Sequence, residues 1–134
     1  MATEQYPSGL GTLDADLMEL LPEDSKRYAK TCFSCTGADD FPDQLNQTGR
    51  NQIILTGMES HVCVLQTAMD LINTGYQVFV AADAVCSRNR ENYESSLQRM
   101  RQAEAVITNT ESILFEWLRD ASHEHFKTLS ALIR

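Results

Sequence analysis

The stretch QIILTGMESHVCV, residues 52–64, decides the fold of this chain. Its apolar run IIL predicts a strand over residues 52–56, buried on both faces and ending at Gly57. Apolar residues then recur at spacings of three and four, which predicts a helix that ends at Asn73-Thr74-Gly75. The apolar positions of this helix are Val62, Leu65, Met69 and Ile72. A strand followed at once by a helix is the first half of a βαβ unit.

Strands and helices alternate along the rest of the chain. The expected strands cover residues 28–33, 77–82 and 105–108, and the expected helices cover 14–21, 92–103, 112–118 and 124–133, with one helical turn at 41–46. Residues 1–13 are expected to form a loop with two turns. This alternation predicts an α/β protein, a three-layer αβα sandwich with a Rossmann-like, mostly parallel sheet. Functional sites in such folds lie beyond the carboxyl ends of the strands.

Composition narrows the class of partner. The 134 residues carry 19 acidic and 11 basic side chains, a net charge of −8. An acidic chain repels phosphate backbones, so nucleic acid is not expected as a partner. No apolar run approaches the roughly 18 residues of a membrane span, and the N-terminus does not look like a signal peptide. We therefore expect a cytoplasmic protein of one domain, without a membrane partner, whose cysteines are reduced.

Cys63 is the first candidate for chemistry. We expect its helix to begin near Ser60, a residue type favoured at N-caps, which would place Cys63 in the first turn, where backbone N–H groups are unpaired. A thiolate there is stabilised by the helix dipole and can attack a carbonyl carbon, with neighbouring N–H groups holding the oxyanion. The alternative is a buried structural cysteine, which Val62 and Val64 on either side would also suit.

Lys30 is the second candidate. In AKTCFSC, residues 29–35, it is a lone cation in a strand that is otherwise half-buried. A lysine there favours an ionised thiol or holds a developing negative charge. The alternative is a surface lysine with a packed aliphatic stem. His61 lies in the same turn as Cys63, but we expect it to line a pocket rather than to act as the base of the thiol, because close neighbours on a helix do not face each other.

Two further features have competing readings. Cys32 and Cys35 form a C-x-x-C, which suits a redox pair or half of a zinc site. No second C-x-x-C completes a zinc site, and a redox motif has its first cysteine at a helix start, whereas Cys32 is expected inside a strand. We therefore expect no metal and no other cofactor. Asp83 ends the strand 77–82 and is expected either to cap the next turn or to line the pocket.

Several segments occur in a characteristic order, namely AKTCFS, GMESHVCVLQTAMDL, VAADAVCSR, QRMRQAEAVITNTES and HFKTLSALI. Together they resemble the isochorismatase-like cysteine hydrolase family, in the branch of small isochorismatase-domain proteins close to the bacterial YcaC-like hydrolases. The resemblance implies a catalytic triad of Asp, Lys and Cys. Cys63 matches the nucleophile of the family's G-x-x-[ST]-x-x-C-V motif, and Lys30 matches the lysine of K-x-x-F-S.

The resemblance also implies a cis peptide bond between Met58 and Glu59, just before the helix of the nucleophile. Such a bond would turn the Met58 carbonyl aside and open the N–H groups of Val62 and Cys63 to an oxyanion. Met58, Glu59, Val62 and His61 are accordingly expected to form the oxyanion site and the pocket around Cys63.

The chain departs from the family at its start. Family members begin with a strand that carries the triad aspartate, followed by a helix and a second strand, and this chain is expected to start near the end of that second strand, at ATEQYP. We therefore expect a single domain over residues 1–134 that is truncated at its N-terminus, with the first strand missing. No aspartate of the chain matches the triad acid.

The sequence thus predicts an isochorismatase-like hydrolase that acts on a small amide or a related small molecule. Cys63 would be its nucleophile, Lys30 would assist, and turnover would be impaired because the triad aspartate is absent. One alternative is a truncated, non-catalytic domain that oligomerises or mediates interactions, and another is a thiol-redox role for the C-x-x-C. The expected partners are a small-molecule substrate and further copies of the chain, because family members are commonly oligomers.

Overall fold

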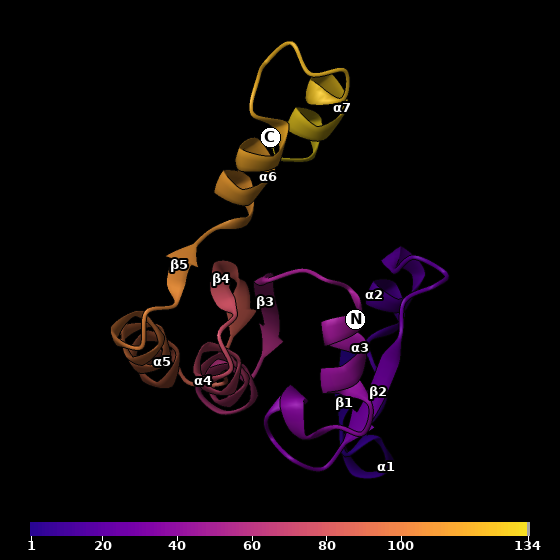
Figure 1. Ribbon diagram of the computed structural model, residues 1–134, viewed down its shortest axis with the longest axis vertical. Coiled ribbons are helices and arrows are strands. Elements are labelled where there is room, and N and C mark those ends of the chain that lie inside the picture. The colour runs from indigo at the N-terminus through magenta and orange to yellow at the C-terminus, as the bar shows by residue number, and fades with distance from the viewer. Residues whose placement is uncertain (134) are drawn as a thin grey trace.

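The strands form two parallel sheets in the computed structural model, which describes residues 1–133. β1 (Ala2–Gln5) pairs with β2 (Arg27–Lys30) in one sheet. The second sheet has the order β3-β4-β5 and consists of β3 (Gln52–Met58), β4 (Gln77–Cys86) and β5 (Val106–Thr108). Helices flank both sheets, so the predicted α/β class with parallel strands is confirmed (Figure 1). The single sheet that the sequence suggested is present as two.

The helices lie around these two sheets. They are α1 (Pro7–Leu10), α2 (Ala15–Leu20), α3 (Phe41–Gln47), α4 (Leu65–Asn73), α5 (Arg90–Gln102), α6 (Thr110–Leu118) and α7 (Phe126–Ser130). α4 and α5 lie side by side and pack against β4 and β5, whereas α6 and α7 extend away from the sheets (Figure 1). None of the helices within residues 1–133 is long and apolar enough to cross a membrane.

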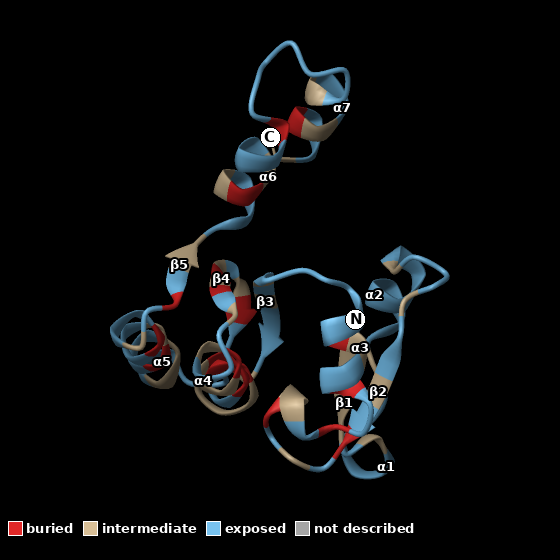
Figure 2. Ribbon diagram, viewed as in Figure 1, coloured by how far each residue is buried: buried red, intermediate tan, exposed pale blue. Residues whose placement is uncertain are grey.

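The core lies between the second sheet and α4 and α5. Val78 and Val80 of β4 face Leu71 of α4 and Met100 of α5 in one buried cluster. Buried residues accordingly concentrate in β4, α4 and α5 (Figure 2). The helix predicted from the apolar spacing is present, but its buried face is centred on Leu65, Ala68 and Leu71. Of the positions named from the sequence, Leu65 is buried, and Met69 and Ile72 are half-buried against the same cluster.

Several predicted boundaries are wrong. Residues 1–13 form β1 and α1 rather than a loop, because the polar segment ATEQ gains its backbone hydrogen bonds by pairing with β2. β2 ends at Lys30, so Cys32 lies in the bend after the strand and not inside it. β4 continues through Asp83 to Cys86. The final helix is divided into α7 and a 3₁₀ turn over Ala131–Ile133.

The loop after β2 ties the first sheet to α4. The Cys35 N–H donates to Thr67 Oγ1 at 2.9 Å, and the Thr36 hydroxyl donates to Asp70 Oδ2 at 3.0 Å. Thr67 is buried, with 2% of its surface exposed, so its hydroxyl is shielded from water. These contacts hold the end of β2 against the helix that follows Cys63.

A carboxylate in β4 holds the start of α6. Asp83 accepts from the Thr110 N–H at 2.9 Å and from the Thr110 hydroxyl at 2.6 Å. Asn109 caps the same helix by accepting from the Ser112 N–H at 2.7 Å. The Thr110 hydroxyl is the main cause of a pKa of Asp83 below its usual value. The expectation that Asp83 caps the turn directly after its strand is wrong, because β4 continues to Cys86 and the carboxylate binds the start of α6, 27 residues later.

Thr67→Val tests the link between the first sheet and α4. The substitution keeps the shape of the side chain but leaves the Cys35 N–H without its acceptor, so we expect a loss of about 1–3 kcal/mol in the free energy of unfolding. Urea unfolding measures the change. Thr74→Val, at the exposed end of α4, is the matched control and should alter stability by less than about 0.5 kcal/mol. Equal effects of the two substitutions would contradict the structural role of Thr67.

Asp83→Ala should loosen α6 selectively. We expect faster amide hydrogen exchange across residues 110–118 than in the wild type, and unchanged exchange in α5. Glu116→Ala, on the exposed face of α6, is the control. Since the pKa of Asp83 is lowered in the folded state, its contribution is present above the unfolded value of about 3.9 and is lost as the pH falls through the lower folded value. After correction for the intrinsic exchange rate, which itself falls in acid, protection in α6 should therefore decrease more in the wild type than in the alanine variant as the pH is lowered.

Candidate active site

Lys30 ends β2 as a buried ammonium group, with 6% of its surface exposed. Its Nζ donates to Gln5 Oε1 at 2.5 Å, to the Phe33 carbonyl at 2.8 Å and to the Cys32 carbonyl at 3.1 Å. An ammonium group has three N–H donors, so all of them are used, and all three acceptors are uncharged. The structure thus excludes the alternative of a surface lysine that projects into water.

Gln5, the last residue of β1, brings Lys30 and Cys63 together. Gln5 and Lys30 are register partners in the first sheet. The Oε1 atom that accepts from Lys30 also accepts from Cys63 Sγ at 3.7 Å. The ammonium group and the thiol therefore lie on either side of one oxygen atom and can be no farther apart than these two hydrogen bonds combined. The two candidates named from the sequence meet, although β2 and the turn of Cys63 belong to separate sheets.

Cys63 lies in a π-helical turn, Ser60–Val64, that precedes α4. The N-cap of this turn is Glu59, so the prediction that Ser60 caps the helix is wrong. The Ser60 side chain is instead fully buried and contacts the Ser87 hydroxyl at 2.5 Å and the Ser96 hydroxyl at 3.0 Å. These contacts fix the turn against the residue that follows β4 and against the middle of α5.

The peptide bond between Met58 and Glu59 is cis, as the resemblance implied. The Glu59 carbonyl accepts from the Val62 N–H at 3.1 Å and from the Val64 N–H at 3.2 Å. The expectation that the Val62 N–H is open to an oxyanion is therefore contradicted, because this donor is occupied inside the turn. Met58 itself is 69% exposed at the end of β3 and does not form an enclosed pocket wall.

The polar contacts of His61 are with residues other than Cys63. Its Nδ1 lies 2.9 Å from Ser87 Oγ and 3.4 Å from Glu59 Oε2. The Glu59 carboxylate in turn accepts weakly from the Arg88 N–H, at 3.4 Å. These contacts agree with the expectation that His61 is not the base of Cys63. Ser87 was missed by sequence reasoning, and its only signal was its position directly after β4.

The C-x-x-C cysteines have separate partners. Cys32 Sγ donates to the Ser34 carbonyl at 3.3 Å, and Cys35 Sγ lies 3.3 Å from Thr3 Oγ1. Both thiols are free, as are those of Cys63 and Cys86. Within residues 1–133 no group of three or more His, Cys, Asp or Glu side chains is placed to hold a metal ion.

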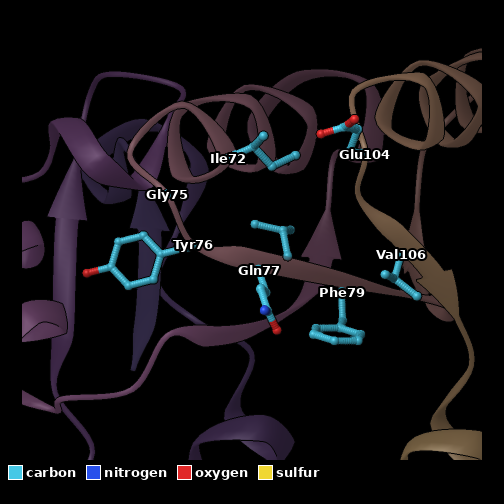
Figure 3. A pocket seen from close by; sticks show the side chains of 8 residues that line it. Ile72, Gly75, Tyr76, Gln77, Phe79, Glu104 and Val106 are labelled. Atoms are coloured by element: carbon cyan, nitrogen blue, oxygen red, sulfur yellow. The ribbon is translucent and has the colours of Figure 1, made fainter.

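Two cavities lie at different distances from the cluster of Lys30, Gln5 and Cys63. One, of about 380 Å³, lies at the carboxyl ends of β1 and β2 and is lined by residues that include Lys30, Cys32, Tyr6 and Asp39. The other, of about 320 Å³, lies at the amino ends of β4 and β5 beside Phe79 (Figure 3). Of these two cavities, only the first is lined by a residue of the Lys30–Gln5–Cys63 cluster, namely Lys30, and neither is lined by Cys63 or Gln5.

Comparisons with known proteins agree with this geometry. Residues 2–112 match the family described as isochorismatase domain. Isochorismatase family protein 1B of Dictyostelium discoideum is 43% identical over 132 residues, which cover 95% of this chain and 63% of that protein. The chain thus spans less than two thirds of the length of this curated relative.

Solved structures show the same relationship. The MAR1 ribonuclease of Caenorhabditis elegans aligns with a TM-score of 0.89 at 37% identity, over 98% of this chain and 67% of that one. YcaC of Pseudomonas aeruginosa, which carries covalent acrylamide, and YcaC of Escherichia coli, an octameric hydrolase of unknown specificity, each align with a TM-score of 0.83 at 27% identity, over 89% of this chain and 59% of theirs. Because the family match covers most of the chain and the fold agrees, this chain belongs to the isochorismatase domain family.

Proposed function

We propose that this chain carries the nucleophile of a hydrolase that acts on a small amide or a related small molecule. Cys63 is the nucleophile and Lys30 is the group that stabilises its thiolate. The observation that carries the proposal is that the Cys63 thiol and the Lys30 ammonium group bracket a single oxygen, Gln5 Oε1. Sites in parallel α/β folds lie at the carboxyl ends of the strands, where Gln5 and Lys30 end β1 and β2.

The proposed reaction proceeds through a thioester. The Cys63 thiolate attacks the carbonyl carbon, and the carbonyl oxygen takes up the electron pair as an oxyanion. Collapse of this intermediate breaks the C–N bond, and the amine leaves with a proton from solvent. Water then attacks the thioester, which releases the carboxylic acid and regenerates Cys63. The Lys30 ammonium group, held in a site of low polarity, favours the anionic forms along this path.

Turnover is proposed to be weak for the chain alone. Among residues 1–133 the hydrogen-bond partners of Lys30 and Cys63 include no carboxylate. A positioned acid or base contributes a factor of about 10² to 10⁴ in rate, so a chain that leaves proton transfer to water should lose a factor of that size.

The size of the site and the charge of the chain favour a small substrate. The cavity beside Lys30, about 380 Å³, has a volume that suits a small molecule, although Cys63 is not among the residues that line it. A structural neighbour is named a ribonuclease, but a phosphodiester chain would approach this protein against its net charge of −8. The covalent acrylamide in the P. aeruginosa neighbour supports a reactive nucleophile in this fold.

Iodoacetamide labelling tests the nucleophile. At neutral pH we expect Cys63 to be alkylated at least about tenfold faster than Cys86, because the neighbouring Lys30 ammonium group stabilises the thiolate that reacts. Exposure alone would give the opposite order, because Cys86 is exposed and Cys63 is half-buried. Peptide mass spectrometry after timed quenching measures both rates in the same sample.

Two variants make this test specific. Lys30→Met should remove the advantage of Cys63, whereas Lys26→Met, an exposed lysine before the same strand, should leave it intact. Release of amine from a panel of small amides, compared between the wild type and Cys63→Ala, then tests turnover. Faster labelling of Cys86 than of Cys63, with no effect of Lys30→Met, would refute the proposal and leave a non-catalytic domain.

Self-association is the second proposed property, and two highly exposed apolar side chains support it. Trp117 of α6 is 69% exposed and Leu132, beyond α7, is 76% exposed. Large apolar side chains at such exposure are typical of surfaces that another protein covers. The octameric state of the E. coli neighbour supports a homo-oligomer without setting its size.

Trp117→Asp should therefore disrupt assembly. We expect the wild type to sediment as a species larger than its 15.1 kDa monomer at micromolar concentration, and the variant to shift toward the monomer. Glu116→Gln, an exposed neighbour on α6, should sediment like the wild type. A wild type that is monomeric, or a Trp117→Asp variant that assembles normally, would rule out this surface.

A further inference from the structure

We propose that Gln5 restrains the reactivity of Cys63: in the free protein its side-chain oxygen accepts a hydrogen bond from the Cys63 thiol, which favours the protonated form, and occupies one N–H of Lys30. Gln5 is thus a positioning residue that restrains the nucleophile. This inference deepens the proposed function and rests on it.

The orientation of the Gln5 amide is fixed by its own contacts. Gln5 Nε2 donates to the Thr31 carbonyl at 2.7 Å, so the opposite end of the amide, Oε1, must face Lys30 and Cys63. The backbone is fixed as well, because Gln5 and Lys30 are register partners and the Tyr6 N–H donates to the Lys30 carbonyl at 2.7 Å. Gln5 Oε1 therefore cannot leave the thiol without breaking other hydrogen bonds.

An amide oxygen can only accept hydrogen bonds. It stabilises Cys63 when the thiol carries its proton, and it presents the negative end of a dipole to the thiolate. The same oxygen accepts from Lys30, whose other two N–H groups are taken by the Cys32 and Phe33 carbonyls. Gln5 thus favours the neutral thiol in two ways. It accepts a hydrogen bond from the thiol, and it occupies an N–H of the ammonium group that would otherwise turn toward the sulfur.

The full charge of Lys30 outweighs the partial charge of the Gln5 oxygen. For this reason Cys63 of the wild type is still expected to react faster than Cys86, although more slowly than it would without Gln5. A ligand with an N–H group, such as a primary amide, can bind Gln5 Oε1 and release both the thiol and one N–H of Lys30. Reactivity of the nucleophile is then coupled to occupancy of the site.

Other titratable groups lie around the turn that carries Cys63. They are Lys30 and Cys32 from β2 and the bend after it, Glu59 and His61 from the turn itself, Cys86 and Arg88 at the end of β4, and Tyr93 of α5. His61 and Glu59 bind Ser87 and the Arg88 N–H, and Tyr93 donates to the Ala82 carbonyl. Of these groups only Lys30 is hydrogen-bonded to Gln5, so substitutions of Gln5 leave the contacts of the others in place.

The test measures the rate of Cys63 alkylation by iodoacetamide as a function of pH in two variants with opposite expected effects. Gln5→Met keeps the length of the side chain and removes the acceptor, so Cys63 should react about tenfold faster at neutral pH, with its pH profile moved to lower pH. Gln5→Glu introduces a carboxylate that accepts a hydrogen bond from the thiol and pairs with the Lys30 ammonium group, so Cys63 should react more slowly than in the wild type and its profile should move to higher pH.

Gln52→Met, at the exposed start of β3, is the matched control and should leave the profile of Cys63 unchanged. A purely structural role of Gln5 would lower the thermal midpoint and speed labelling of Cys32 and Cys35 in both variants, without effects of opposite sign on Cys63. Equal or slower labelling of Cys63 in Gln5→Met overturns the inference. This outcome is distinct from failure of the proposed function, which appears in the wild type itself as slower labelling of Cys63 than of Cys86.

Discussion

The structure depends on a buried ammonium group that has no carboxylate partner among the hydrogen bonds of the described chain. Burial of a charge is tolerated only where hydrogen bonds replace those of water. Lys30 meets this condition through Gln5 and the carbonyls of Cys32 and Phe33. These bonds fix three segments at once: the end of β1, the end of β2 and the bend that follows it. A thiolate at the neighbouring Cys63 would supply the negative charge that is missing among the hydrogen-bond partners of Lys30.

The residues of the candidate site come from both sheets, and this arrangement brings a lysine and a cysteine together. Gln5 and Lys30 come from β1 and β2, and Cys63 comes from the turn after β3. Each sheet supplies one partner of the ion pair that the proposed reaction needs. The hydrogen bonds of Thr67 and Asp70 with the loop after β2 hold Lys30 and Cys63 in position relative to each other. Contacts at some distance from the sulfur therefore contribute to the geometry of the site.

The sequence predicted those parts of the fold that local periodicity determines. β3 and α4 followed from the run IIL and from apolar spacing. Only α4 buries apolar side chains, however. No residue of β3 is buried and Ile54 is 37% exposed, so the expectation of a strand buried on both faces is wrong. β1 could not be predicted in this way, since ATEQ is polar and becomes a strand only by pairing with β2. Cys63 and Lys30 were identifiable because their residue types carry chemistry. Gln5 was not, because its importance arises from a contact with a residue 58 positions away in the chain. The turn of Cys63 was misassigned at Ser60, whose hydroxyl serves buried partners instead of capping the helix.

The separation of the two sheets has a consequence for handling the protein. In the described chain β1 and β3 each lie at the end of their sheet, so each presents one row of backbone N–H and C=O groups that no neighbouring strand satisfies. Such rows are templates on which extended segments of other molecules can add. Concentrated samples should therefore be prone to slow, open-ended aggregation that is rich in intermolecular β-structure, and cosolvents that keep other chains from these strands should prolong their useful lifetime.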